Sequence, residues 1–138
     1  MISLIYVSRA RNKLPADLKD ILASARRNNP PLGVTGALCL LDGVYLQYLE
    51  GETSAVKALY EHIQSDPRHT AIKAVSCAST SKRLFSDWSM ALMTWNDQTR
   101  AIFRAFSPQA NIDLYEIDPA NARVIFESFT RTPDWQEV

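Results

Sequence analysis

The chain has 138 residues, of which 46% are hydrophobic, and its 15 basic residues balance its 15 acidic ones. This length is enough for one compact domain with a core and too short for two comfortable ones. The absence of net charge leaves no basic field for nucleic acid or an anionic membrane surface, so neither is an expected partner. No stretch approaches the roughly 20 apolar residues of a membrane span, and we expect a cytoplasmic protein.

The first part of the chain predicts a strand followed by an amphipathic helix. Residues 2–7 form an apolar run rich in branched side chains, and residues 16–28 repeat apolar positions with helical spacing. The asparagines at 28–29 can end this helix, and Pro30-Pro31 is expected to prevent its continuation.

A β-hairpin is predicted next. Residues 33–41 and 44–50 are strand candidates, and they are separated by Asp42-Gly43. An Asp-Gly pair between two apolar runs is the strongest short signal for a two-residue hairpin turn, because both positions accept a positive φ.

A second helix and two more strands complete the predicted sheet. The helix is expected to start with Thr53 or Ser54 as its N-cap and to stop before residue 66, where an Asp-Pro pair follows. Residues 71–78 and 88–94 supply the two strands.

The resulting order, βαββαββ, predicts an α+β fold, a ferredoxin-like sandwich, because each helix must cross right-handed onto one face of a common sheet. We expect the first and third strands to be parallel neighbours at the sheet centre, with Tyr6 beside Gln47. The two helices cover only one face, so helices within 98–131 are expected to cover the other. Residues 1–96 are therefore assigned to the core and residues 97–138 to a C-terminal helical extension that packs on the sheet within the same domain.

Gln47 stands as an uncharged amide in an otherwise apolar strand. Burying it costs about 1 to 3 kcal/mol unless both its carbonyl and its NH2 group find partners. Tyr6, Asn28, Asn29 and Gln47 titrate poorly near neutral pH but donate and accept hydrogen bonds, which suits recognition of a flat heterocycle with polar edges. Taken singly, each residue also has an ordinary explanation, as a helix stop or as core packing.

Catalytic and metal-binding motifs are not found in the sequence. His62 and His69 lack ligand-spaced partners, and the spacing alone favours a surface loop for His69 over a phosphate-binding or loop-capping role. An acylphosphatase-like enzyme is one alternative, with Arg9 and Asn28 as candidate residues, although the loop after the first strand has no glycine to cradle a phosphate. A non-catalytic module that binds a ligand or a protein is the other alternative.

Six short segments follow one another with a distinctive order and spacing. They are Tyr6-Val7-Ser8, Ala25-Arg26-Arg27-Asn28-Asn29, Gly33-Val34-Thr35-Gly36, Leu46-Gln47-Tyr48-Leu49-Glu50-Gly51, Asp66-Pro67-Arg68-His69 and Phe85-Ser86-Asp87-Trp88-Ser89-Met90. Together they resemble the BLUF family of blue-light sensors that use flavin. The resemblance covers roughly residues 2–95 and makes residues 1–96 the flavin-binding core of a short, stand-alone sensor that is not an enzyme.

The resemblance implies a flavin ring between the two helices, packed against the sheet. The polar edge of the ring would meet Tyr6, Gln47 and Asn29, and Asn28 is a further contact. FAD is the expected cofactor, with FMN and riboflavin as alternatives.

The same resemblance assigns the walls and the outer end of the flavin site. Ile21 and Ile63 match the aliphatic side chains that sandwich the ring, although core packing alone also explains them. Arg68 and His69 match a segment near the ribityl and phosphate groups, where a cation can offset negative charge.

The resemblance also implies a photochemical switch. Blue light excites the oxidised flavin, an electron and then a proton pass from Tyr6, and recombination leaves an altered hydrogen-bond network around Gln47. Trp88 and Met90 match the switch-associated positions on the last strand. The expected output is a change in a homo-oligomer, or in the binding of a separate signalling protein, through that strand or the C-terminal helices.

Overall fold

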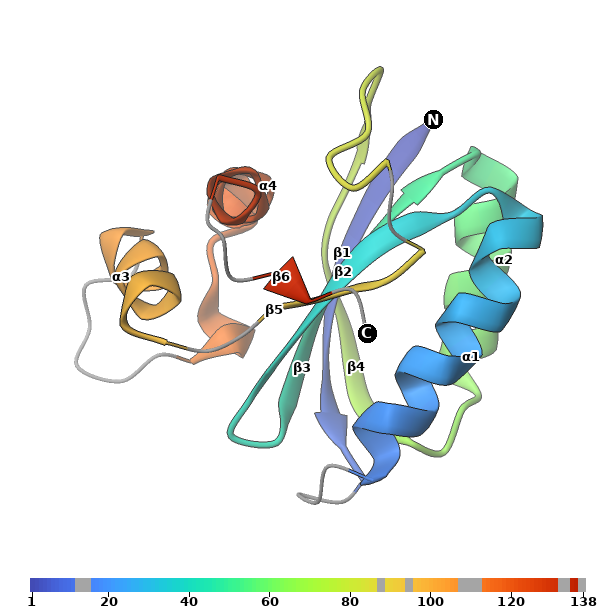
Figure 1. The fold of residues 1–138 in the computed structure, drawn as a ribbon, viewed down its shortest axis with the longest axis horizontal. Helices are drawn as coiled ribbons and strands as arrows, with labels where there is room; N and C mark the ends of the chain where they lie inside the picture. The colour runs from blue at the N-terminus through green and yellow to red at the C-terminus, as the bar shows by residue number, and fades with distance from the viewer. Residues whose placement is uncertain (12–15, 87–88, 94–95, 107–112, 132–134, 137–138) are drawn as a thin grey trace.

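The computed structural model covers residues 1–138 and describes all of them except 12–15, 87–88, 94–95, 107–112, 132–134 and 137–138. One six-stranded sheet, with strand order β4-β1-β3-β2-β5-β6, lies between two helical layers, α1 with α2 and α3 with α4 (Figure 1). The elements are β1 (Ile2–Ala10), α1 (Ala16–Leu32), β2 (Thr35–Leu41), β3 (Val44–Gly51), α2 (Thr53–Gln64), β4 (His69–Ser79), β5 (Ala91–Met93), α3 (Asp97–Phe106), the short 3₁₀ helix η1 (Leu114–Glu116), α4 (Pro119–Phe129) and β6 (Trp135–Gln136).

The α+β, ferredoxin-like prediction is confirmed, and β1 and β3 lie near the sheet centre with both faces buried. Side chains alternate along each strand, so neighbouring residues enter different cores. Tyr6 and Tyr45 belong to the core under α1 and α2, whereas Val7 and Tyr48 belong to the core under α4.

The predicted parallel pairing of the first and third strands is wrong, because β1 and β3 are antiparallel. The crossover through α1 returns the chain parallel to β1 in β2, and the two-residue hairpin then reverses its direction before β3 enters between them. The predicted proximity survives this correction, since Tyr6 and Gln47 are direct partners in the β1–β3 register.

Helix α1 continues through the proline pair to Leu32, so the prediction that it stops at Asn28 and Asn29 is wrong. Two prolines in a last turn remove only two backbone donors, and their fixed φ is helical. Gly33, at φ +66°, ends the helix. Its N–H donates to the backbone carbonyl oxygen of Pro30 at 3.0 Å, and the N–H of Val34 donates to the backbone carbonyl oxygen of Asn29 at 3.1 Å. This pair of bonds is a Schellman motif.

The hairpin prediction is confirmed, since Asp42 and Gly43 adopt φ values of 50° and 76° between β2 and β3. The predicted caps of α2 are wrong: Glu52 occupies the N-cap position and makes no hydrogen bond through its side chain. Strand β3 runs through Gly51, which leaves a single residue between the strand and the helix.

The prediction that helices within 98–131 cover the second face is confirmed. Helices α3 and α4 pack on the side of the sheet opposite α1 and α2 (Figure 1). Their apolar residues join the sheet in one aromatic core, which includes Tyr48, Phe85, Phe103, Phe126 and Phe129. Among the helices that the structure describes, none is long and apolar enough to cross a membrane.

Candidate functional site

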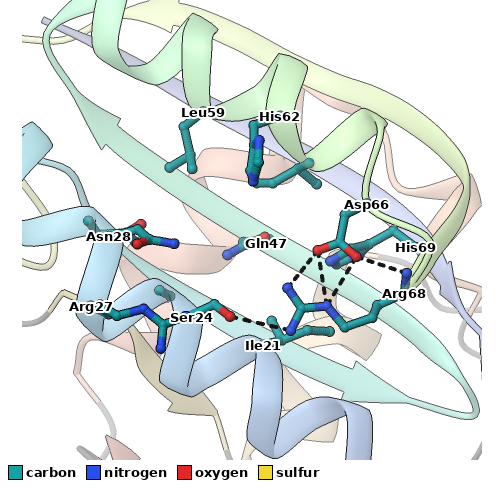
Figure 2. A pocket seen from close by; sticks show the side chains of 13 residues that line it. Ile21, Ser24, Arg27, Asn28, Gln47, Leu59, His62, Asp66, Arg68 and His69 are labelled. Atoms are coloured by element: carbon teal, nitrogen blue, oxygen red, sulfur yellow. Dashed lines mark hydrogen bonds and ion pairs between the residues drawn. The ribbon is translucent and has the colours of Figure 1, made fainter.

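A cavity of about 200 Å³ lies between α1 and α2 and reaches down to the sheet (Figure 2). This volume greatly exceeds the roughly 10 to 15 Å³ that a cavity needs to hold one water molecule. The residues that line the cavity are Ile21, Ser24, Ala25, Arg27, Asn28, Asn29, Gln47, Leu59, His62, Ile63, Asp66, Arg68 and His69.

Gln47 lies in the lining with both ends of its amide engaged. The Tyr6 hydroxyl donates to its Oε1, and its Nε2 donates to Sδ of Met90 at 3.4 Å. All three side chains are at most 3% exposed. Burial raises the pKa of the Tyr6 phenol well above its ordinary value, so the phenol keeps its proton at neutral pH. The buried amide therefore connects a phenol to a thioether along the edge of the cavity.

The two asparagines of α1 differ in exposure because successive helical residues point in different directions. Asn29 is 1% exposed, and its Nδ2 donates to the Ser89 carbonyl oxygen at 2.9 Å. Asn28 is exposed at the rim of the cavity (Figure 2). Asn29 and Gln47, the two buried amides of the cavity, thus contact consecutive residues, Ser89 and Met90, just before β5.

Aliphatic side chains from the two helices line facing sides of the cavity. Ile21 of α1 is 5% exposed, and Leu59 and Ile63 of α2 are half-buried. Each lies on the apolar side of its own helix, so the same pattern that attaches the helices to the sheet also leaves aliphatic walls. Such walls suit a flat, apolar ring face.

Arg68 is paired inside the site. Its guanidinium donates to the Asp66 carboxylate, with Nη2 to Oδ2 at 2.6 Å and Nε to Oδ1 at 3.0 Å, and Nη1 donates to Ser24 Oγ at 3.4 Å (Figure 2). Hydrogen bonding to Arg68 lowers the pKa of Asp66, and the same contact raises the pKa of Arg68. The pair adds no net charge to the cavity.

His69 is not a surface loop residue, so that interpretation of the spacing is wrong. It is the first residue of β4, is 6% exposed, and its Nδ1 lies 2.9 Å from Ser8 Oγ. Pairing of β4 with β1 extends to Ala10 and His69, which draws the histidine into the core. Burial lowers the pKa of His69, so the ring is neutral at pH 7.

The structure brings together most of the residues named from the sequence. Ile21, Asn28, Asn29, Gln47, Ile63, Arg68 and His69 line the cavity, and Tyr6 and Met90 contact Gln47 behind it. Trp88 lies outside the described residues.

Some lining residues were missed by the sequence reasoning. Leu59 carried a signal, since it lies on the apolar face of α2, and Asp66 stands in the same short segment as Arg68. Ala25 and Arg27 stand in the same short segment as Asn28 and Asn29, whereas Ser24 and His62 carried no signal.

The alternative catalytic pair is not brought together. The Arg9 guanidinium carbon lies 5.1 Å from the centre of the Tyr115 ring, on the side of the sheet away from the cavity. Asn28 lies on α1, at the rim of the cavity on the opposite side of the sheet.

In the described part of the chain, no group of three or more His, Cys, Asp or Glu residues could hold a metal ion. The site therefore offers amides, one phenol, a neutral imidazole and aliphatic walls, a set that suits a flat heterocycle such as flavin.

Comparison with known proteins identifies the family of this chain. The family described as "Sensors of blue-light using FAD" matches residues 1–91. The photoactivated adenylate cyclase subunit beta of Euglena gracilis is 35% identical over 96 residues, which are 68% of this chain and 11% of that protein. The chain thus spans about a tenth of the length of this curated relative.

Two solved structures resemble almost the whole chain. The ground state of BlsA gives a TM-score of 0.87 at 29% identity and covers 96% of this chain and 89% of its own. The dark state of BlrB, titled a BLUF protein, gives 0.74 at 31% identity and covers 93% and 92% of the two chains. Because the family match spans well over half of the residues and ends at the segment that holds Met90, this chain belongs to the BLUF family of flavin-based blue-light sensors.

Proposed function

We propose that this chain is a blue-light photoreceptor whose flavin is held without a covalent bond in the cavity between α1 and α2. The observation that carries the proposal is the contact of the Tyr6 hydroxyl with Gln47, whose other end reaches Met90. The hydrogen bonds join three buried groups in series: a phenol, an amide that can exchange donor and acceptor, and a polarisable thioether.

The flavin would be held by the residues that line the cavity. Asn29 and Gln47 would meet its polar edge, with Asn28 at the rim, and Ile21 and Ile63 would flank the faces of the ring. FAD is the proposed form, in keeping with the family description, and FMN and riboflavin are the alternatives. Arg68 and His69 would lie toward the ribityl and phosphate groups, and since Arg68 is paired and His69 is neutral, they would contribute hydrogen bonds more than charge.

Bound in this cavity, oxidised flavin supplies blue-light absorption and an excited state that accepts an electron. Tyr6 would give up an electron and recover it when the charges recombine, and its proton has an acceptor at Oε1 of Gln47. The raised pKa of Tyr6 keeps that proton on the phenol in the dark. Rotation or tautomerisation of the Gln47 amide then exchanges a donor for an acceptor at nearly constant shape, so the network gains a second arrangement without a second fold.

The rearranged amide is in direct contact with the segment that enters β5. Its Nε2 contacts Met90, and Asn29 contacts Ser89, so both amides act on the segment that enters β5. Trp88, two residues before Met90, is proposed to share the switch. One hydrogen bond contributes about 0.5 to 1.5 kcal/mol net, which can shift a balanced interface but cannot unfold a domain.

The output is therefore proposed to be an altered interface without enzymatic activity of the chain itself. We propose one domain, with residues 1–96 as the flavin-binding core and residues 97–138 as the extension that receives the change from β5. The interface would bind a separate signalling protein or a second copy of the chain.

Absorption spectra before and after blue light test the proposal. The purified protein should be yellow and should show a reversible red shift, and acid-released flavin identifies the cofactor. Tyr6→Phe should keep the flavin and lose the shift. Tyr45→Phe is the matched control, because the Tyr45 hydroxyl is buried on the same side of the sheet and has no hydrogen-bond partner among the described residues. A colourless protein would contradict flavin binding, and a full shift in Tyr6→Phe would contradict the role of Tyr6.

A further inference from the structure

Ser8 and His69 form an isolated polar pair beside the cavity. Ser8 lies on β1 two residues after Tyr6 and has no solvent exposure. Its Oγ lies 2.9 Å from Nδ1 of His69, and this is the only side-chain hydrogen bond of Ser8 among the described residues. The mechanism proposed above does not use Ser8.

The hydrogen bond decides which ring nitrogen carries the proton. A neutral imidazole has one N–H donor and one acceptor nitrogen, whereas a hydroxyl has a single proton to donate. If Nδ1 of His69 donated to Ser8, the serine proton would be buried without an acceptor, which is costly. If Ser8 donates to Nδ1, both groups are satisfied and the ring proton resides on Nε2.

The other side of the ring is open to the cavity. His69 is one of the residues that line the cavity (Figure 2). Its Nε2 has no hydrogen-bond partner among the described residues. Because Nε2 is also not one of the fully buried atoms that lack a partner, solvent can reach it. The orientation of the ring is held on its flanks by aromatic neighbours, Tyr45 at 5.3 Å and Tyr6 at 6.3 Å between ring centroids.

We infer that Ser8 sets the tautomer of His69, so that His69 presents Nε2–H as a hydrogen-bond donor to an uncharged acceptor oxygen of the bound flavin. Two parts of a flavin carry such oxygens, the ring carbonyls and the ribityl hydroxyls. This inference rests on the proposed function for the identity of the ligand. Ser8 is thereby a positioning residue, and His69 is the contact.

Nitrogen-15 spectra of the histidine side chains, recorded at a pH where both rings are neutral, test the tautomer without any ligand. The chain has only two histidines, and the exposed His62 gives the reference signal of a ring that samples both tautomers. His69 should show a protonated Nε2 and a bare Nδ1. In Ser8→Ala this preference should be lost, and in Ser8→Thr, which keeps the hydroxyl, it should remain. Ser3→Ala is the control, because Ser3 is a buried β1 serine that contacts Arg123 on the opposite face.

Titration of the flavin-free chain with two flavins tests the contact. Riboflavin carries the ribityl hydroxyls, and lumiflavin has the same ring without them. Ser8→Ala should weaken riboflavin binding by roughly 2- to 12-fold, the range of one net hydrogen bond. A matching loss for lumiflavin assigns the contact to a ring carbonyl, and an unchanged lumiflavin affinity assigns it to the ribityl chain.

The outcomes separate this inference from the proposed function. A proton on Nδ1 of His69 in the unaltered protein would overturn the inference whatever the flavin does. Unchanged affinity for both flavins in Ser8→Ala would overturn the donor contact. A chain that takes up no flavin refutes the proposed function and the contact together, while the spectra still decide whether Ser8 sets the tautomer.

Discussion

The two faces of the central sheet use the same strands and are filled in different ways. Under α1 and α2, Tyr6 contacts Gln47 beside a cavity of about 200 Å³ whose lining includes nine polar or charged side chains, among them Asn29 and His69. Under α3 and α4, aromatic rings contact one another directly, with Phe126 5.2 Å from Tyr48 and 5.6 Å from Phe129 between centroids.

Under the proposed function, one small sheet separates stability from signalling. Gln47 and Tyr48 are neighbours in β3, and strand alternation sends one to the cavity and the other to the aromatic core. The aromatic face supplies packing that does not depend on a ligand. The cavity face keeps polar groups whose arrangement can change without opening the core.

Truncation in the aromatic core should have the largest effect on stability. Phe126→Ala removes a fully buried ring, so we expect the free energy of unfolding to fall by about 3 to 5 kcal/mol. Urea unfolding measures the loss, and the light-induced shift of the folded protein should persist. Val124→Ala on the same helix is the control: Val124 is 42% exposed, and its change should stay within about 0.5 kcal/mol. A cost below about 1 kcal/mol for Phe126→Ala would show that α4 is not part of the core.

Paired substitutions on the cavity face should have a smaller effect with a different signature. Gln47→Leu leaves the Tyr6 hydroxyl buried without an acceptor, which costs about 1 to 3 kcal/mol. The double variant Tyr6→Phe with Gln47→Leu removes both partners and should be close to neutral. A double-mutant cycle on the flavin-free protein, which avoids linkage to binding, measures the coupling. Additive losses would show that the two groups do not depend on each other.

The sequence predicted the elements of both faces better than their boundaries and directions. Periodicity located Phe126 and Ile21 on the correct helix faces, because alternation and helical spacing are local properties. The direction of β3 relative to β1 was predicted wrongly. The two-residue turn at Asp42 requires β3 to run antiparallel to β2, and β2 runs parallel to β1, so the correct direction could have been predicted from the sequence. The predicted end of α1 is too early because the glycine that ends the helix, Gly33, lies beyond a proline pair, and prolines usually stop a helix.

Some site residues could be located from the local sequence pattern, and others could not. The buried Gln47 stood out as a polar break in an apolar strand, and its neighbour Tyr6 followed from the topology. His69 could not be placed from its own segment, because pairing between β1 and β4 decides its burial. The Asp66 partner of Arg68 lies two residues away in the same short segment, whereas the contact of Arg68 with Ser24 of α1 is tertiary, and spacing gives no information on it.

The buried histidine predicts a pH dependence that belongs to the cavity face. Desolvation lowers the pKa of His69 in the folded state below its ordinary value of 6.5; Asp66 and Asp17 oppose this shift, and Arg68 adds to it. Between the folded and unfolded pKa values the unfolded state binds more protons, so stability should fall as the pH drops below about 6.5, by at most about 1.4 kcal/mol per pH unit for one proton. His69→Gln should flatten this part of the curve, as measured by urea unfolding at several pH values.

His62→Gln is the matched control for this experiment. His62 is exposed on α2, so its removal should change the free energy of unfolding by no more than about 0.5 kcal/mol. An equal flattening by both substitutions would show that His69 does not differ from a solvated histidine.

The smallest expected effect concerns the ion pair on α4. Arg123 contacts Glu127 at 3.2 Å, but the Glu127 side chain is 41% exposed, so Glu127→Gln should cost no more than about 0.5 kcal/mol. Arg123 also donates to Ser3 and Tyr48 on the sheet, both at 3.2 Å, and Arg123→Met should therefore cost more than Glu127→Gln. Urea unfolding of the two variants compares them. Equal costs for Glu127→Gln and Arg123→Met would show that the ion pair accounts for the whole contribution of Arg123. A larger cost for Arg123→Met means that the polar contacts of Arg123 with the sheet add to the aromatic packing of this face.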